Sequence, residues 1–325
     1  MTDQIKIFQD KLNQELDSLE LGNRPKELYT PLRYTLDLGG KRMRPILALM
    51  SYLSVKSDWE KIVKPALSIE LFHNFTLIHD DIMDEAPLRR GKPTVYQKWN
   101  KDIGILSGDA LMILAYDLLL EADFSDFKYL IKIFNRCAIE VCEGQQLDMN
   151  FEERGTVHED EYIEMIRLKT AVLLGYSLEL GALLAGLEKE DAIHFRDFGV
   201  NIGIGFQLKD DLLDVYGEAE KFGKQVGGDI IANKKTWLLI RALELAQGST
   251  QEELQGWIDK KEFDSEEKVN AVKAIYDQLD IHDLAEAKMN EYFDKGFDQL
   301  DALARENLNL EPLIGFTRAL IERDH

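Results

Sequence analysis

The sequence predicts an all-α protein, a large helical bundle around a central cavity, formed as one domain over residues 1–325. Three observations favour this fold class. None of the seven prolines lies between residues 94 and 311, and proline breaks helix interiors and marks turns. Apolar residues recur at a spacing of three to four along most of the chain. No run of alternating apolar and polar residues bounded by turns predicts a strand.

The individual helices follow from that spacing in chain order. The apolar period predicts helices over 5–19, 62–83, 110–120, 129–149, 162–187, 192–216, 237–246, 269–279, 284–303 and 313–321. Thr156 and Ser249 each stand three residues before a glutamate, and these capping boxes predict that a helix starts at each. The helices 162–187 and 192–216 are apolar on most of their circumference, so other helices must surround them. The glycine-rich stretch 217–236 predicts an irregular connection.

The composition indicates a globular chain of strongly acidic charge. Its 39 Lys and Arg against 60 Asp and Glu give a net charge of −21, which argues against a nucleic-acid partner. Cys137 and Cys142 are too few for a disulfide framework and fit reduced thiols. The first residues lack a basic and then apolar segment, and Glu179 interrupts the most apolar stretch. We therefore expect a cytoplasmic protein with no signal peptide and no transmembrane segment.

Two aspartate clusters interrupt the most apolar helices. Both have the pattern Asp-Asp-x-x-Asp, with Asp80, Asp81 and Asp84 in the first and Asp210, Asp211 and Asp214 in the second. Residues four apart share a helix face, so the outer aspartates of each cluster point together and repel. A hard divalent cation such as Mg²⁺, which takes oxygen ligands, would remove that repulsion. Two such faces across a cavity would bind a phosphate-bearing ligand, whereas a solvated acidic surface is the alternative.

Basic residues cluster beside glycine-rich turns in this acidic chain. They lie in 39–45, in 88–93, at Lys169, at Lys224 and at Lys234. Arginine and lysine at such turns supply the forked donors and point charges that a diphosphate needs. His73 stands seven residues before Asp80, two turns along roughly the same helix face. That alignment favours a ligand-binding role for His73 over a purely structural one.

Together these motifs resemble those of the trans-isoprenyl diphosphate synthases, the polyprenyl synthetase family of farnesyl and geranylgeranyl diphosphate synthases. The similarity runs from about residue 25 to the C-terminus and rests on the segments 39–45, 72–84, 89–91, 144–145, 169–170, 205–214, 222–224 and 234–236. It implies the isoprenoid-synthase fold and a homodimer. It also implies a Mg²⁺-dependent, head-to-tail condensation of isopentenyl diphosphate with an allylic diphosphate (dimethylallyl, geranyl or farnesyl).

The resemblance further implies roles for individual residues. Lys41, Arg44, His73 and Arg90 would bind isopentenyl diphosphate. Arg89, Lys169, Thr170, Gln207, Lys224 and Lys234 would bind the allylic substrate. Asp80, Asp84 and Asp210 would hold three Mg²⁺ ions, which Mn²⁺ would replace, and with Lys169 they would act in catalysis. Phe72, Phe75 and Thr76, one to two turns before Asp80, would limit product length to geranylgeranyl or farnesyl diphosphate.

Two other functions share part of these features. A class I terpene cyclase also uses Asp-Asp-x-x-Asp, and Asp210, Asp214 and Glu218 have the spacing of its second metal motif. Such a cyclase has no site for isopentenyl diphosphate, so the group Lys41, Arg44, His73 and Arg90 argues against it. A regulatory subunit of a heteromeric synthase is expected to have lost metal carboxylates, whereas both clusters are intact in this sequence.

Overall fold

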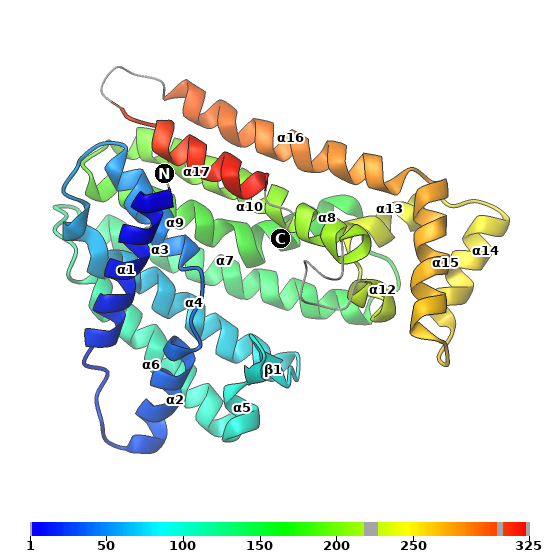
Figure 1. Ribbon diagram of the computed structural model, residues 1–325, viewed down its shortest axis with the longest axis horizontal. Coiled ribbons are helices and arrows are strands. Elements are labelled where there is room, and N and C mark those ends of the chain that lie inside the picture. The colour runs from blue at the N-terminus through cyan, green and yellow to red at the C-terminus, as the bar shows by residue number, and fades with distance from the viewer. Residues whose placement is uncertain (1, 218–226, 304–307, 323–325) are drawn as a thin grey trace. The chain divides into compact units, whose positions relative to one another are not determined.

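The computed structural model describes residues 2–217, 227–303 and 308–322, which cluster into two compact units. Unit 1 comprises 1–134, 176–196 and 303–316, and unit 2 comprises 135–175, 197–302 and 317–325. Both units are almost wholly helical, which confirms the predicted fold class (Figure 1). The unit boundaries fall within helices α7 (Phe127–Glu153), α9 (Val172–Leu184), α10 (Lys189–Tyr216) and α17 (Glu311–Ile321). That the chain forms one domain stays a prediction.

Unit 1 is built mainly from the first third of the chain. Its elements there are α1 (Thr2–Ser18), α2 (Lys26–Asp37), α3 (Met43–Leu53), the 3₁₀ turn η1 (Trp59–Ile62), α4 (Val63–Met83), α5 (Val95–Lys98) and α6 (Lys101–Leu119). Helix α4 packs along α6 and also contacts α1 and α3 (Figure 1). Every side chain of α4 from residue 65 to residue 72 is buried, as expected for a helix that is apolar all round. This burial fixes the helix that carries the first aspartate motif.

A two-stranded hairpin follows α4, where the sequence predicted no strand. Strand β1 (Leu88–Arg89) pairs antiparallel with β2 (Lys92–Pro93), and Arg89 lies opposite Lys92. Arg90 and Gly91 form the connecting turn with φ values of 53° and 74°. Positive φ at both central residues is the requirement of a type I′ turn, which glycine meets without strain. The basic run after the first aspartate motif is therefore a tight hairpin.

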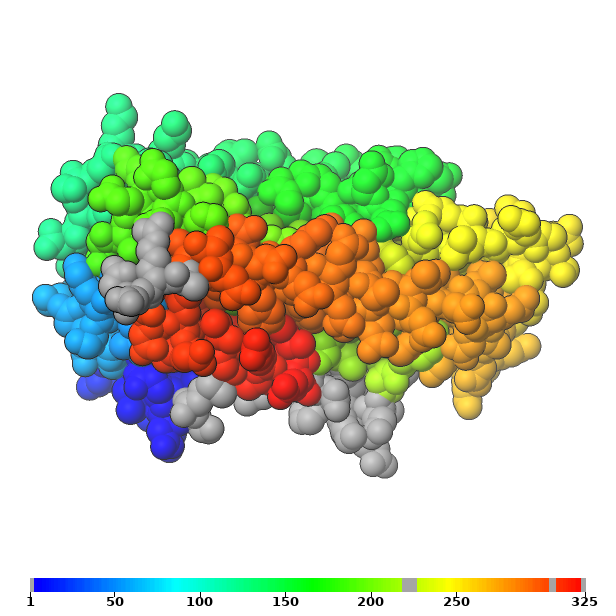
Figure 2. Space-filling model, turned by 90° about the horizontal axis from the view of Figure 1, so that it is seen from above, coloured from blue at the N-terminus to red at the C-terminus, as the bar shows by residue number. Residues whose placement is uncertain are grey.

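Unit 2 contains most of the later helices. They are α8 (Glu159–Ile166), the π-helical turn η2 (Arg167–Ala171), α12 (Gly228–Ile231), α13 (Trp237–Leu245), α14 (Ser249–Asp259), α15 (Ser265–Gln278) and α16 (Ile281–Ala302). Helix α16 lies at the surface of its unit, next to α15 (Figure 2). Its inner side, which includes Ile281, Ala285 and Phe293, is buried. Within the described ranges, none of the helices combines the length and the apolar character that crossing a bilayer requires.

Three local predictions differ from the structure. The predicted helix 162–187 is interrupted by the π-helical turn Arg167–Ala171. Gly144 of α7 contacts this turn so closely that a Cβ there would lie 2.2 Å from Lys169 N, which explains why glycine is needed. The helix start predicted at Thr156 is wrong, because helix α8 begins after His158, whose N–H donates to the Glu161 carboxylate. Helix α14 begins at Ser249, as predicted, but Gly248 and not Ser249 is its N-cap residue.

Candidate active site

The predicted isopentenyl diphosphate residues lie in unit 1: Lys41 just before α3, Arg44 in the first turn of α3, His73 on α4 and Arg90 on the hairpin. Arg44 places Nη1 3.1 Å from His73 Nε2. Arg90 lies against the backbone of Gly40, because a Cβ added there would be 2.9 Å from Arg90 Nη1. Lys41 directly follows Gly40 in the chain, and its side chain is exposed. The structure thus brings Arg44 into contact with His73 and sets Arg90 against the residue before Lys41.

The protonation of His73 follows from its neighbours. Burial lowers the pKa of His73 well below its usual value, and Arg44, Arg90, Arg89 and Arg42 lower the pKa further. A guanidinium only donates, so His73 Nε2 accepts the hydrogen bond from Arg44 and the ring proton sits on Nδ1. A neutral histidine that can donate through Nδ1, next to guanidinium groups, is a donor set suited to an oxyanion.

The first aspartate motif ends α4, and its three carboxylates have different surroundings. The Asp84 N–H donates to Asp80 O at 2.8 Å, so the helical repeat keeps these two residues on one face. Asp80 is half-buried and Asp84 is exposed. Asp81 is only 4% exposed and binds Arg89 twice, from Nη2 to Oδ1 at 2.6 Å and from Nε to Oδ2 at 3.0 Å. Burial raises the pKa of Asp81, and Arg89 opposes that shift.

The second motif lies inside α10 and divides in the same way. Asp210, the predicted metal ligand, is exposed. Asp211 is 3% exposed, and its Oδ2 accepts hydrogen bonds from Tyr162 OH at 2.6 Å and from Trp237 N at 3.4 Å. Burial raises the pKa of Asp211 to about 7, although the Tyr162 hydrogen bond opposes that shift. The middle aspartate therefore links α10 to α8 and α13.

The third aspartate of this motif holds the chain that leads to α13. The Asp214 carboxylate accepts the N–H of Asp229 at 2.9 Å, and its carbonyl accepts the N–H of Gly227 at 2.6 Å. Lys234 N in turn donates to Asp229 O at 2.9 Å. Asp214 is therefore engaged with the backbone of α12, which leaves Asp210 as the exposed carboxylate of the second motif.

The residues predicted for the allylic substrate are distributed over both units. Arg89 lies on the hairpin of unit 1, whereas Lys169 and Thr170 lie in the π-helical turn, Gln207 on α10 and Lys234 just before α13, all in unit 2; Lys224 lies outside the described residues. Lys169 Nζ donates to Asp148 Oδ2 on α7 at 2.5 Å. A diphosphate that binds Lys169 or Arg89 must therefore compete with a carboxylate already in place.

The three residues predicted to limit product length have different environments. Phe72 is 1% exposed and packs against the rings of Phe75 and Phe134, with centroids 5.7 and 5.4 Å away. Phe75 is half-buried, and its ring lies edge-on to His79. Thr76 Oγ1 donates to a carbonyl of its own helix at 2.8 Å. Phe72 is thus a core residue, while Phe75 keeps part of its ring at the surface of unit 1.

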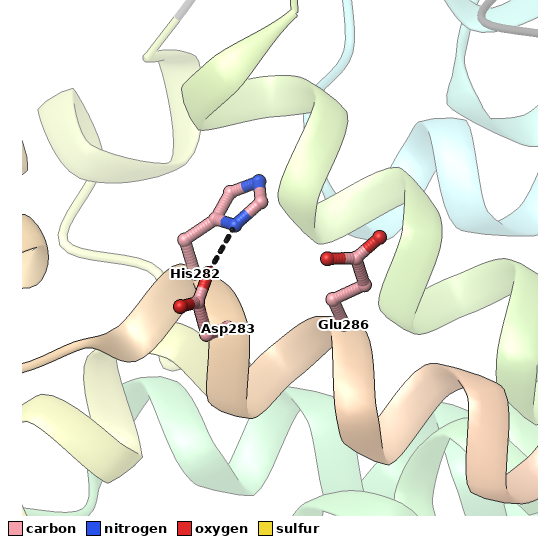
Figure 3. A group of neighbouring side chains, drawn as sticks. All are labelled: His282, Asp283 and Glu286. Carbon is pink, nitrogen blue, oxygen red and sulfur yellow. Dashed lines mark hydrogen bonds and ion pairs between the residues drawn. The ribbon is translucent and has the colours of Figure 1, made fainter.

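A separate group of possible metal ligands lies at the start of α16. His282, Asp283 and Glu286 place ligand atoms within 4.8 Å of one another, the one such group within the described ranges (Figure 3). His282 Nδ1 is 3.2 Å from Asp283 Oδ1, and its ring lies edge-on to Tyr216. Asp283 and Glu286 are exposed, where carboxylates ordinarily stay hydrated. None of the predicted metal ligands belongs to this group.

Sequence reasoning missed four residues that hold these motifs in place. They are Arg42, Glu70, Tyr162 and Asp148. Arg42 stands within the basic run 39–45, and Glu70 is a charged residue inside an apolar helix, so a buried pairing of the two was a possible inference. Nothing in the sequence distinguishes Asp148, because the chain has 60 acidic residues and Asp148 lies on a helix of mixed polar and apolar residues.

Comparisons with known proteins agree with the motif pattern. The family model described as Polyprenyl synthetase matches residues 25–278. A geranylgeranyl pyrophosphate synthase from Geoglobus acetivorans is 37% identical over 325 residues, which cover 98% of this chain and 99% of that protein. A crystal structure of a geranylgeranyl pyrophosphate synthase matches with a TM-score of 0.91 and 41% identity, covering 98% of each chain. A geranylgeranyl pyrophosphate synthase from Corynebacterium glutamicum, complexed with isoprenyl diphosphate and magnesium, matches with a TM-score of 0.80 and 27% identity, covering 98% of this chain and 97% of that one. This chain therefore belongs to the polyprenyl synthetase family.

Proposed function

We propose that this trans-prenyltransferase condenses isopentenyl diphosphate with an allylic diphosphate and releases geranylgeranyl diphosphate as its main product, with farnesyl diphosphate next. The observation that carries the proposal is the contact of Arg44 with His73, with Arg90 set against Gly40. These donors fit a second diphosphate in addition to the allylic one. A terpene cyclase uses no second diphosphate and would not need them. A regulatory subunit is disfavoured because both aspartate motifs are intact. The similarity to geranylgeranyl pyrophosphate synthases supports the product.

We assign the metal site to Asp80, Asp84 and Asp210, with three Mg²⁺ ions and with Mn²⁺ as a substitute. The donor chemistry fits, because Mg²⁺ prefers carboxylate oxygens and keeps several waters. Asp81 and Asp211 are buried, and the Asp214 carboxylate binds the backbone of α12, so we assign the ligand role to Asp80, Asp84 and Asp210. When bound, the metal neutralises diphosphate charge and makes the diphosphate a better leaving group.

The chain's own residues perform the remaining steps. Lys169, Lys234 and Arg89 are assigned to the allylic diphosphate, where they stabilise the negative charge that builds up as the allylic C–O bond breaks. Arg44 and His73 hold isopentenyl diphosphate so that its double bond attacks the allylic cation. The released diphosphate takes the proton that the new product loses. Apolar side chains of α4 exclude water, which would otherwise convert the cation to an alcohol.

The product length is the part of the proposal that one experiment tests. Incubation with dimethylallyl and isopentenyl diphosphates and Mg²⁺, followed by mass analysis, should give geranylgeranyl diphosphate. We assign the limit to Phe75, so Phe75→Ala should yield longer chains, because removing the ring leaves space that packed interiors do not otherwise contain. Phe297→Ala, which truncates a half-buried phenylalanine of α16, is the matched control. An unchanged product distribution in Phe75→Ala would exclude Phe75 as the limit, and an allylic substrate consumed alone would favour a cyclase.

We also propose a cytoplasmic homodimer. Helix α6 and the residue after it expose Leu106, Ile113 and Leu120, with exposed fractions of 59, 63 and 60%. Residues seven apart lie along one helix face, and an apolar strip of this kind fits a contact between subunits. Light scattering of the purified chain tests the dimer. Neither Cys137 nor Cys142 forms a disulfide, which fits a reducing compartment.

A further inference from the structure

A buried ion pair lies behind the isopentenyl diphosphate residues of unit 1. Arg42 Nη1 is 2.6 Å from Glu70 Oε1, and each side chain is only 4% exposed. Arg42 immediately precedes α3 and has a left-handed backbone, with φ of 50° and ψ of 35°. L-residues other than glycine adopt this conformation at a cost, so the position must be held by its contacts.

The Arg42 guanidinium donates to three different helices. Nη1 binds Glu70 on α4, Nη2 binds Leu36 O in the last turn of α2 at 2.9 Å, and Nε binds Asn13 Oδ1 on α1 at 3.2 Å. Asn74 completes the group by donating to Glu70 Oε1 at 3.3 Å and to Glu70 O at 2.8 Å. One side chain thus fixes the start of α3 relative to α1, α2 and α4.

Overall stability does not by itself account for this arrangement. A buried ion pair ordinarily contributes no more to stability than apolar side chains of similar volume, because both charges lose their hydration. The location is more informative. Arg42 stands between Lys41 and Arg44, and Glu70 stands one helical turn before His73. The pair therefore joins the two chain segments whose side chains meet at the Arg44–His73 contact.

We propose that Arg42 and Glu70 are positioning residues for isopentenyl diphosphate: their ion pair fixes the segment that carries Lys41 and Arg44 against the helix face that carries His73. This inference rests on the proposed function of those three residues. Neither Arg42 nor Glu70 needs to touch the substrate, because both are buried. Their effect is to keep the donors in the geometry that a diphosphate requires.

The double variant Arg42→Met/Glu70→Leu separates positioning from stability. It replaces the pair with apolar side chains and leaves no unpaired buried charge, although Leu36 O and Asn13 lose a donor, so its thermal midpoint should fall less than that of Glu70→Leu alone. The Kd and KM for isopentenyl diphosphate should rise about tenfold or more, because charge-assisted hydrogen bonds lose their geometry. The KM for the allylic substrate should change by less than about twofold, since that site uses other residues.

Two further variants keep the test decisive. Arg42→Lys retains the charge but cannot bind Glu70, Leu36 O and Asn13 together, so its Kd for isopentenyl diphosphate should lie between those of the wild type and the double variant. Arg33→Met is the matched control, because Arg33 donates to Leu16 O at 2.9 Å and Leu19 O at 2.8 Å without contacting the substrate residues, and its Kd should not change.

Calorimetric titration of isopentenyl diphosphate distinguishes the possible failures. If the wild type binds this substrate and the folded variants bind it equally well, the positioning role is wrong while the proposed function stands. If the double variant does not fold, Arg42→Lys alone decides the question. If the wild type neither binds nor consumes isopentenyl diphosphate, the proposed function and the inference both fail.

Discussion

The two aspartate motifs have the same spacing but lie in different surroundings. The first ends α4, and its middle aspartate forms an ion pair with Arg89 of the hairpin. The second lies inside α10, and its middle aspartate accepts a hydrogen bond from the neutral Tyr162 hydroxyl. In both motifs the middle carboxylate is buried, at 4% and 3% exposure, and it lies about 100° around the helix from the first aspartate and about 60° from the third. Asp80, Asp84 and Asp210 are at least partly exposed, whereas the Asp214 carboxylate binds the backbone of α12. The two middle aspartates maintain the local structure by different means.

The largest expected effect on activity comes from substituting the outer aspartates of the two motifs, in contrast to the middle ones. Asp80→Ala or Asp210→Ala should lower kcat/KM by about a thousandfold or more, because each removes a carboxylate that we assign to the metal site. For the exposed Asp210, the free energy of unfolding should change by less than about 0.5 kcal/mol. Steady-state kinetics and urea unfolding measure the two quantities. Full activity of the wild type in excess chelator would show that no metal is needed.

The next effect distinguishes the basic residues near each motif. Arg90→Ala or Lys41→Ala should raise the KM for isopentenyl diphosphate by about tenfold or more and affect the allylic KM less. Lys234→Ala in unit 2 should do the reverse, and Lys224→Ala should behave like Lys234→Ala. Initial rates with one substrate varied and the other saturating provide the comparison. Equal effects on both substrates would mean that the assignment to two diphosphates is wrong.

The two middle aspartates should differ in stability. Asp81→Asn removes one partner of a largely buried ion pair and should cost about 2 kcal/mol of unfolding free energy. Asp211→Asn should cost less than about 1 kcal/mol, because its amide oxygen still accepts the Tyr162 hydroxyl hydrogen. Urea unfolding in metal-free buffer measures both, with the exposed Asp84→Asn as the control. A larger loss of unfolding free energy in Asp211→Asn than in Asp81→Asn would contradict this prediction.

The smallest effect is a pH dependence that arises near the first motif. The folded pKa of His73 lies well below 6.5, so below that pH the unfolded chain binds a proton that the native protein does not. Above the unfolded pKa of about 6.5, His73 is neutral in both states and does not change the free energy of unfolding with pH. Below that pH, His73 lowers the free energy of unfolding as the pH falls. His73→Gln should weaken this dependence between about pH 6.5 and pH 5. An identical slope in the variant and the wild type would contradict the assignment.

Much of the fold could be predicted from the sequence. The proline-free interval and the apolar period predicted an all-helical chain because both depend on local backbone chemistry. The start of α8 was misplaced, since His158 with Glu161 replaces the expected cap at Thr156. The π-helical turn was not predicted because its residues, including Lys169, have the same apolar period and propensities as an α-helix.

The surroundings of the site required the structure. Asp81 and Asp84 look alike in sequence, but one binds Arg89 while the other is exposed. The left-handed backbone of Arg42 and its three helical partners depend on how distant helices meet, and no local pattern encodes that meeting. The sequence could therefore identify the charged residues, whereas the division between exposed and buried side chains came from packing.

The π-helical turn has a consequence for how this chain tolerates deletions. A π-helical turn holds one residue more than an α-helical turn, so it stores an extra position without disturbing the helix on either side. Deleting a single residue there, for instance Leu168, would leave a regular α-helix and preserve the fold around it. Lys169 would then rotate by about 100° relative to α8 and lose both its place beside Gly144 and its carboxylate partner Asp148. At this position a deletion, ordinarily far more harmful than a substitution, should leave a folded protein in which Lys169 has left the place proposed for binding the allylic diphosphate.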